Sequence, residues 1–219
     1  MSKQKQDIIV LTGDLVRSTE LSKDNLNKAL DTLAHCAATL EDALGLSLHF
    51  TVHRGDGWQA AVTRPEYALR VMLSFRAALR SLGERGSDLK FDTKIAAAKG
   101  AAQMPLNPDL NQESQSVFIA SGRCLESMGK TSVAPRLKID AQPELSACFA
   151  LADYISRQWT AAQAQAIYQS LISLQPQTDT AIGIAIGKSR QTVARALHGA
   201  GQSHLIAALH SLENGEPND

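Results

Sequence analysis

The hydrophobic period of this chain changes repeatedly along residues 7–140, and this alternation constrains the fold more than any other feature. Contiguous or alternating apolar residues predict strands, whereas apolar residues that recur every three or four positions predict helices. Residues 7–13, DIIVLTG, predict a buried central strand. Residues 21–44 predict a long helix that ends at Gly45. The expected order of elements over residues 7–140 is β-α-β-β-α-β-α-β.

A hairpin follows the first helix. Residues 46–53 alternate, RGDG turns the chain, and residues 58–62, WQAAV, resume as a strand. The remaining expected elements are a helix that opens at Pro65, a strand over 89–100, a helix over 117–128 that stops at Gly129, and an edge strand over 132–140 that contains Pro135. Split β-α-β halves in this order indicate an α+β fold with a ferredoxin-like sheet and helices on one of its faces.

The pattern becomes purely helical after residue 143. The change falls between residues 140 and 144, around Pro143. We therefore expect two domains, an α+β domain over residues 1–142 and a small all-α domain over residues 143–214, followed by a disordered tail over residues 215–219.

The charge balance limits the partners of the whole chain. Lys and Arg total 22 and Asp and Glu total 22, so the formal charge is zero. Binding to nucleic acid or anionic lipid must therefore come from a local patch. The apolar runs are too short to span a membrane, and the N-terminus, MSKQKQD, lacks the pattern of a signal peptide. With three widely spaced cysteines as well, we expect a cytoplasmic protein with no membrane partner.

Two acidic residues are the main candidates for a functional site. Asp14 ends the first strand and Asp56 occupies the hairpin turn, so a sheet with a central first strand brings both to one edge. Two neighbouring carboxylates favour a divalent cation between them, and Mg²⁺ combines such carboxylates with phosphate oxygens. The backbone N–H groups of residues 16–19, which enter a helix, would cradle the phosphates. The alternative is ordinary turn chemistry, which explains Gly-Asp in most turns.

The motifs together resemble a known family. DLVRSTEL, VHRGDGWQAAV, KFDTKIAAAKGAA and SGRCLESM are similar to the first strand, the Gly-Asp hairpin, the fourth strand and the third helix of class III nucleotidyl cyclases (adenylate and guanylate cyclases). Over nearly its whole length the chain resembles the SatD-like family of bacterial proteins, which has these motifs and ends in a helical segment. The resemblance implies a cyclase-like fold and a site that binds a nucleoside triphosphate (NTP) or another nucleotide.

The same resemblance assigns residue roles. Asp14 and Asp56 would hold two Mg²⁺ or Mn²⁺ ions, with the Leu15 carbonyl as a further ligand. The nucleotide phosphates would bind at Val16, Arg17, Ser18 and Thr19. Arg123 matches the arginine that stabilises charge on the transferring phosphate, and in a cyclase dimer it would act on the nucleotide of the neighbouring protomer.

Two positions depart from the cyclase pattern. Val52 stands where the family has a lysine that reads the purine, and Ile119 stands where it has an asparagine. The residues expected to hold the metal ions are therefore present, whereas those for base recognition and some of those that stabilise the transition state differ from the family pattern. This favours metal and phosphate binding over efficient cyclisation of ATP or GTP.

The C-terminal segment resembles a helix-turn-helix. Gly183 and Gly187 permit close packing and a tight turn, and Val193 and Leu197 return to the core. The residues expected to contact DNA are Lys188, Ser189, Arg190, Gln191 and Arg195. The alternative is a packing or dimerisation unit, because acidic residues outnumber basic ones after residue 150.

Three functions are compatible with these features. The first is a ligand-responsive, DNA-binding transcriptional regulator that senses a nucleotide. The second is a nucleotidyl cyclase or related nucleotidyltransferase that forms a cyclic nucleotide from an NTP and uses its C-terminal helices for dimerisation or partner binding. The third is an inactive scaffold in which the aspartates only shape turns. Cyclase-like sheets and helix-turn-helix readers both commonly work in pairs, so we expect a homodimer.

Overall fold

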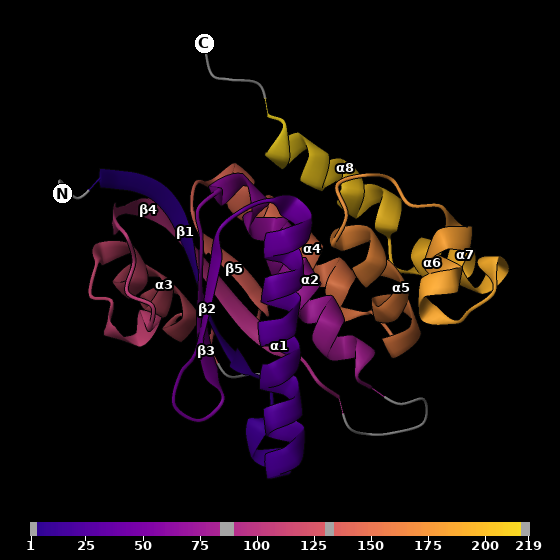
Figure 1. Ribbon diagram of the computed structural model, residues 1–219, viewed down its shortest axis with the longest axis horizontal. Coiled ribbons are helices and arrows are strands. Elements are labelled where there is room, and N and C mark those ends of the chain that lie inside the picture. The colour runs from indigo at the N-terminus through magenta and orange to yellow at the C-terminus, as the bar shows by residue number, and fades with distance from the viewer. Residues whose placement is uncertain (1–3, 84–89, 130–133, 216–219) are drawn as a thin grey trace.

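The computed structural model describes residues 4–83, 90–129 and 134–215. The start of the predicted edge strand, at residues 132–133, and most of the predicted tail lie outside these ranges. The five strands form one sheet in the order β2-β3-β1-β4-β5 (Figure 1). Their bounds are β1 Gln4–Leu15, β2 Leu48–Val52, β3 Gly57–Val62, β4 Thr93–Met104 and β5 Leu137–Asp140. The predicted mixed α+β fold and the predicted order of elements up to β5 are observed.

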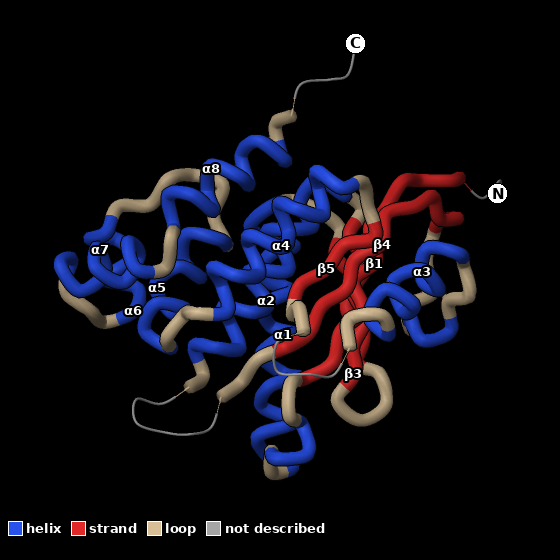
Figure 2. Tube along the Cα trace, turned by 180° about the vertical axis from the view of Figure 1, so that it is seen from behind, coloured by secondary structure: helices blue, strands red, loops and turns tan. Residues whose placement is uncertain are grey.

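The central strand β1 is buried on both faces. Ile9 and Leu11 pack in the main core with helices α1 (Lys23–Leu44) and α2 (Ala68–Ser81). Ile8 and Val10 pack on the other face against α3 (Ser116–Glu126). The prediction that all helices cover one face is therefore wrong, and Figure 2 shows α3 alone on its side of the sheet. The physical reason lies in the β1 sequence, because a strand that is apolar on both faces needs cover on both.

The first helix begins later than its apolar spacing predicts. Residues Ser18–Glu20 form a short 3₁₀ turn, and α1 starts at Lys23 because the Ser22 side chain accepts from the Asn25 amide at 3.2 Å. The end of the helix matches the prediction, since Gly45 adopts a left-handed conformation with φ of 58°.

The last two strands differ in length from their predictions. β4 continues to Met104, because β1 pairs with it from Gln4 onward. β5 is a short edge strand that begins at Leu137, two residues after Pro135, and pairs parallel to β4. Proline has no N–H to donate, which is consistent with its place before the strand instead of inside it.

The C-terminal region is helical, as predicted. Its helices are α4 Pro143–Arg157, α5 Ala161–Leu171, α6 Asp179–Ile186, α7 Arg190–Gly199 and α8 Gln202–Glu213. Their apolar residues, including Phe149, Trp159 and Ile167, belong to the same buried cluster as the sheet and α2. The division into two domains remains a prediction, and the two parts share a core. No helix in the described ranges is both long and apolar enough to cross a membrane.

Candidate functional site

Strand pairing brings Asp14 and Asp56 to the same edge of the sheet. Asp14 lies directly across from Gly57 in the β1–β3 ladder, and the Leu15 amide donates to the Asp56 carbonyl at 3.3 Å. Both aspartates are partly exposed. The β2–β3 turn that carries Asp56 projects beyond the end of the sheet in Figure 1. The two carboxylate-bearing residues are therefore neighbours across two adjacent strands.

The side chain of Asp14 lies on the sheet face that α3 covers. Side chains alternate along a strand, so Asp14 shares its face with Thr12, whose hydroxyl is 2.7 Å from that of Ser121 on α3. Lys94 stands directly across from Asp14 on β4, and its amine donates to the Gly129 carbonyl at 2.8 Å. The edge therefore combines acidic residues with a nearby amine that is held by a backbone carbonyl.

The segment after Asp14 is a turn, not the start of a long helix. The Val16 amide donates to the Asp92 carbonyl at 2.9 Å. In this conformation the amide is therefore already hydrogen-bonded, whereas the sequence predicted that it would donate to a phosphate. Arg17 adopts a left-handed conformation with φ of 56°. The amides of residues 17–19 precede and open the 3₁₀ turn, whose first backbone bonds come from the Glu20 and Leu21 amides, and they make no backbone hydrogen bond to the described residues outside it. Three of the four predicted phosphate-binding positions therefore offer backbone donors.

The donor set at this edge fits a hard divalent cation. Mg²⁺ in proteins is held by one or two carboxylates and completes its shell with water and phosphate oxygens. Asp14 and Asp56 supply two carboxylates, and the Leu15 carbonyl is adjacent in sequence. In the part of the chain that the structure describes, no group of three or more His, Cys, Asp or Glu residues is placed to hold a metal ion. A cation at this edge would therefore need phosphate or water oxygens in addition.

Trp58, two residues after Asp56, belongs to the core. Its side chain is fully buried and packs against the rings of Phe50 and Phe75 at centroid distances of 5.8 and 5.2 Å. Its indole N–H donates to the Thr93 hydroxyl at 3.2 Å, and that hydroxyl donates to the Asp14 carbonyl at 2.7 Å. The Trp58 ring is therefore not free to stack on a base.

A buried ionic cluster lies directly behind the edge, and the sequence patterns did not reveal it. Arg76 on α2 is fully buried and binds Asp92 through two hydrogen bonds of 3.0 Å. It also donates to Asp153 on α4 at 2.6 Å. Arg80 adds a bond to Asp92 at 3.2 Å, and burial lowers the pKa of its guanidinium. In the structure every α2 residue from Ala68 to Leu79 is buried, including Arg70 and Arg76, and the apolar spacing of this helix gave no sign that its arginines would be.

Arg123 is not part of the Asp14–Asp56 edge. It is exposed in the last turn of α3, whereas Ser121 and Cys124 of the same helix face the sheet. Its side chain makes no hydrogen bond or ion pair with the described residues of the edge. Its predicted role therefore needs a second copy of the chain.

The residues predicted to contact DNA lie at the other end of the molecule. Gly187 in the left-handed region and Ser189 as N-cap make the turn between α6 and α7. Lys188, Arg190, Gln191 and Arg195 are exposed there, and both views place α6 and α7 opposite α3 (Figures 1 and 2). Ser189 serves α7 itself, because its side chain accepts from the Thr192 amide at 3.3 Å.

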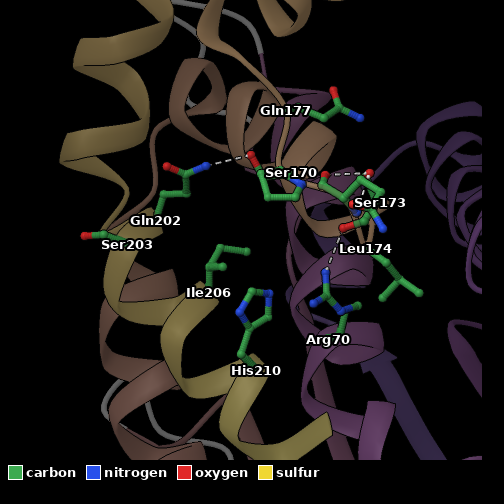
Figure 3. Close-up of a pocket in the computed structure, with 11 residues that line it drawn as sticks. Arg70, Ser170, Ser173, Leu174, Gln177, Gln202, Ser203, Ile206 and His210 are labelled. Atoms are coloured by element: carbon green, nitrogen blue, oxygen red, sulfur yellow. Dashed lines mark hydrogen bonds between the residues drawn. The ribbon is translucent and has the colours of Figure 1, made fainter. Parts of the chain in front are cut away.

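A separate cavity of about 160 Å³ lies between α2, α5 and α8 (Figure 3). The buried Arg70 guanidinium at its wall donates to the Leu171 and Ser173 carbonyls at 3.0 and 3.2 Å and is paired with Glu213. Gln202 donates to the Ser170 hydroxyl at 2.9 Å. Arg70, Gln202 and Ser170 are thus committed to contacts that hold the helices together.

Comparison with known proteins gives matches only at the level of solved structures. No protein-family model matches the chain, and no curated protein is significantly similar to it. The similar solved structures include nucleotidyl cyclases. The guanylyl cyclase Cya2 is 16% identical with a TM-score of 0.44, over 64% of this chain and 77% of that chain. A bacterial light-regulated adenylyl cyclase is 18% identical with a TM-score of 0.47, over 64% of this chain and 45% of that chain.

A third similar structure is the adenylyl cyclase CyaB from P. aeruginosa, which is 12% identical with a TM-score of 0.41, over 58% of this chain and 74% of that chain. The chain thus spans less than half of the light-regulated cyclase and about three quarters of the other two. Likeness at this level does not define an activity.

Proposed function

We propose that this chain binds a nucleoside triphosphate together with Mg²⁺ or Mn²⁺ at the Asp14–Asp56 edge and acts as a nucleotidyl cyclase or a related nucleotidyltransferase. The observation that carries the proposal is the β1–β3 register, which sets Asp14 opposite Gly57 and bonds the Leu15 amide to the Asp56 carbonyl. This register places two carboxylate-bearing residues at adjacent positions, and carboxylates are the ligands that a triphosphate-bound cation accepts.

Each residue of the edge has a role in this proposal. Asp14 and Asp56 hold the cation, with the Leu15 carbonyl as an added oxygen donor. The amides of residues 17–19 donate to phosphate oxygens. When bound, the cation supplies charge neutralisation at the phosphates. Arg123 reaches the transferring phosphate only from a second copy of the chain, so the proposal includes a homodimer.

Base recognition in this proposal differs from that of the class III cyclases. Val52 and Ile119 are 43% and 47% exposed, and neither offers a hydrogen bond to a base. The side chains that would distinguish purines are therefore apolar here. We expect low discrimination between the four NTPs.

Product formation tests the proposal. The 3′-hydroxyl of the ribose releases its proton to solvent and its oxygen bonds to the α-phosphorus, while the bond from this phosphorus to the oxygen that bridges to the β-phosphorus breaks. A cyclic nucleotide, pyrophosphate and a proton therefore form in equal amounts. We expect pyrophosphate release from at least one NTP with Mn²⁺, and its loss in Asp56→Asn. Metal-dependent binding of a nucleotide without release of pyrophosphate would indicate a nucleotide sensor. If no nucleotide binds in a metal-dependent way, the inactive scaffold is the function that is left.

A second candidate function is nucleotide-responsive DNA binding. The observation that favours it is the exposed set of Lys188, Arg190, Gln191 and Arg195 on one short segment. Gel-shift assays of the intact protein at low salt should show binding above the nonspecific level, and Arg190→Ala with Arg195→Ala should remove it. Binding equal in the wild type and this double variant would contradict the candidate.

A further inference from the structure

Asp92 and Thr93 form a junction that holds the chain on both sides of Asp14. The Thr93 hydroxyl donates to the Asp14 carbonyl at 2.7 Å, and the Asp92 carbonyl accepts from the Val16 amide at 2.9 Å. The same hydroxyl accepts from the Trp58 indole at 3.2 Å, which ties in the strand that follows Asp56. Both aspartate-bearing segments therefore depend on where residues 92 and 93 lie.

The Asp92 carboxylate is in turn fixed from α2. It accepts two hydrogen bonds of 3.0 Å from Arg76 and one of 2.9 Å from the Thr93 amide. Paired bonds between a guanidinium and a carboxylate set the orientation of both groups. The backbone that meets Val16 and Asp14 is therefore oriented by Arg76.

Arg76 is shared with the C-terminal helices. Its remaining nitrogen, Nη1, donates to Asp153 at 2.6 Å and to the Ser156 hydroxyl at 3.0 Å, both on α4. The second oxygen of Asp153 accepts from the Arg136 amide at 3.1 Å. The arginine is fully buried and Asp153 is 4% exposed, so solvent screens little of this interaction. The guanidinium is thus held between one carboxylate behind the site and one carboxylate on α4.

We propose that Asp153 is a positioning residue of the Asp14–Asp56 edge, which acts through Arg76 and Asp92 and makes the affinity of the edge for a metal–nucleotide depend on the seating of α4. This rests on the proposed function of the edge. A partner or ligand that displaces α4 changes the orientation of Arg76, and the change reaches Val16 through the Asp92 backbone. In this way α4 regulates the site.

The variant Asp153→Asn tests this link, because it keeps the size of the side chain and cannot satisfy both Arg76 and the Arg136 amide as acceptors. The matched control is Glu213→Gln. Glu213 also makes a buried pair with an arginine of α2, at 2.6 Å from Arg70, but that pair lies at the cavity between α2, α5 and α8. Both variants lose a buried ion pair between α2 and a C-terminal helix.

The first readout is the Kd of the intact protein for Mn²⁺–ATP by calorimetry. We expect Asp153→Asn to raise this Kd about five-fold or more, and Glu213→Gln to leave it unchanged at a comparable loss of thermal stability. An equal Kd in Asp153→Asn and wild type, or an equal rise in both variants, would overturn the proposal.

The second readout does not need a nucleotide. Hydrogen exchange of the Val16 amide should be faster in Asp153→Asn than in wild type and unchanged in Glu213→Gln. If the wild type binds no Mn²⁺–nucleotide, the proposed function fails, and unchanged Val16 exchange would separately overturn the link between α4 and this loop.

Discussion

Gly13 shows how tightly the strand beside the candidate site is packed. A Cβ at this position would lie 2.6 Å from the Lys94 carbonyl oxygen and closer still to the Trp58 ring. Both neighbours are fixed, since one is backbone and the other is a buried ring. A glycine is therefore required directly before Asp14.

Gly13→Ala should lower the free energy of unfolding by about 1–3 kcal/mol, because the added methyl overpacks the core. Gly122→Ala is the matched control, since a Cβ there meets no atom within 4 Å and α3 gains helix propensity. Denaturant unfolding measures both. Equal stability of Gly13→Ala and wild type would contradict the close approach.

Cys36 gives a stability effect with a defined pH window. Burial raises the pKa of its thiol from 9.0 to about 12. An acid whose folded pKa is raised contributes stability below its unfolded pKa, and this stability is lost as the pH rises toward the folded pKa. Between pH 9 and about 12 the wild type should therefore lose stability more steeply than Cys36→Ala. Parallel pH profiles of the free energy of unfolding would show that this thiol is not the cause.

At the scale of elements, the ion pair between α2 and α8 is expected to hold the C-terminal helix. Arg70 and Glu213 form two bonds of 2.6 and 2.7 Å with almost no exposure of either side chain. Arg70→Met leaves the Glu213 charge buried and should cost about 3–5 kcal/mol. The double variant with Glu213→Leu should recover most of this loss in denaturant unfolding. If the double variant is as unstable as Arg70→Met alone, this account of the pair is contradicted.

The order of elements could be predicted because each switch of hydrophobic period is local. Adjacency of Asp14 and Asp56 follows from that order, since a central β1 next to the hairpin leaves few other arrangements. The position of α3 could not be predicted in this way, because its apolar stripe fits either face of the sheet. The cluster of Arg76, Asp92 and Asp153 was also missed, since pairing between distant charged side chains leaves no periodic trace in the sequence.

At the scale of the whole molecule, the C-terminal helices are packed into the core of the sheet region. Trp159 is almost fully buried, and its indole N–H donates to the Ala200 carbonyl at 2.9 Å, while Phe149 joins the cluster that contains α2. The residues before and after the change to a purely helical pattern near Pro143 thus share a core. The regulation proposed for Asp153 depends on this continuity.

The oligomeric state remains a prediction. Arg123 is exposed and apart from the Asp14–Asp56 edge, so a site that uses it requires two chains. Light scattering at micromolar concentration should give twice the mass of one chain. The mass of a single chain would contradict both the homodimer and the role of Arg123.

Metal-dependent binding of a nucleotide tests the central claim most directly. Thermal unfolding of the wild type with Mn²⁺ and a methylene-bridged ATP analogue should show a stabilisation of roughly 2.7 kcal/mol at a hundred times the Kd. Without ligand, Asp56→Asn should unfold at the same temperature as the wild type, and with ligand it should show no metal-dependent shift. The control Asp42→Asn, on the exposed face of α1, should keep the shift. An equal shift in wild type and Asp56→Asn, or no shift with any NTP analogue, would contradict the assignment of this edge as the site.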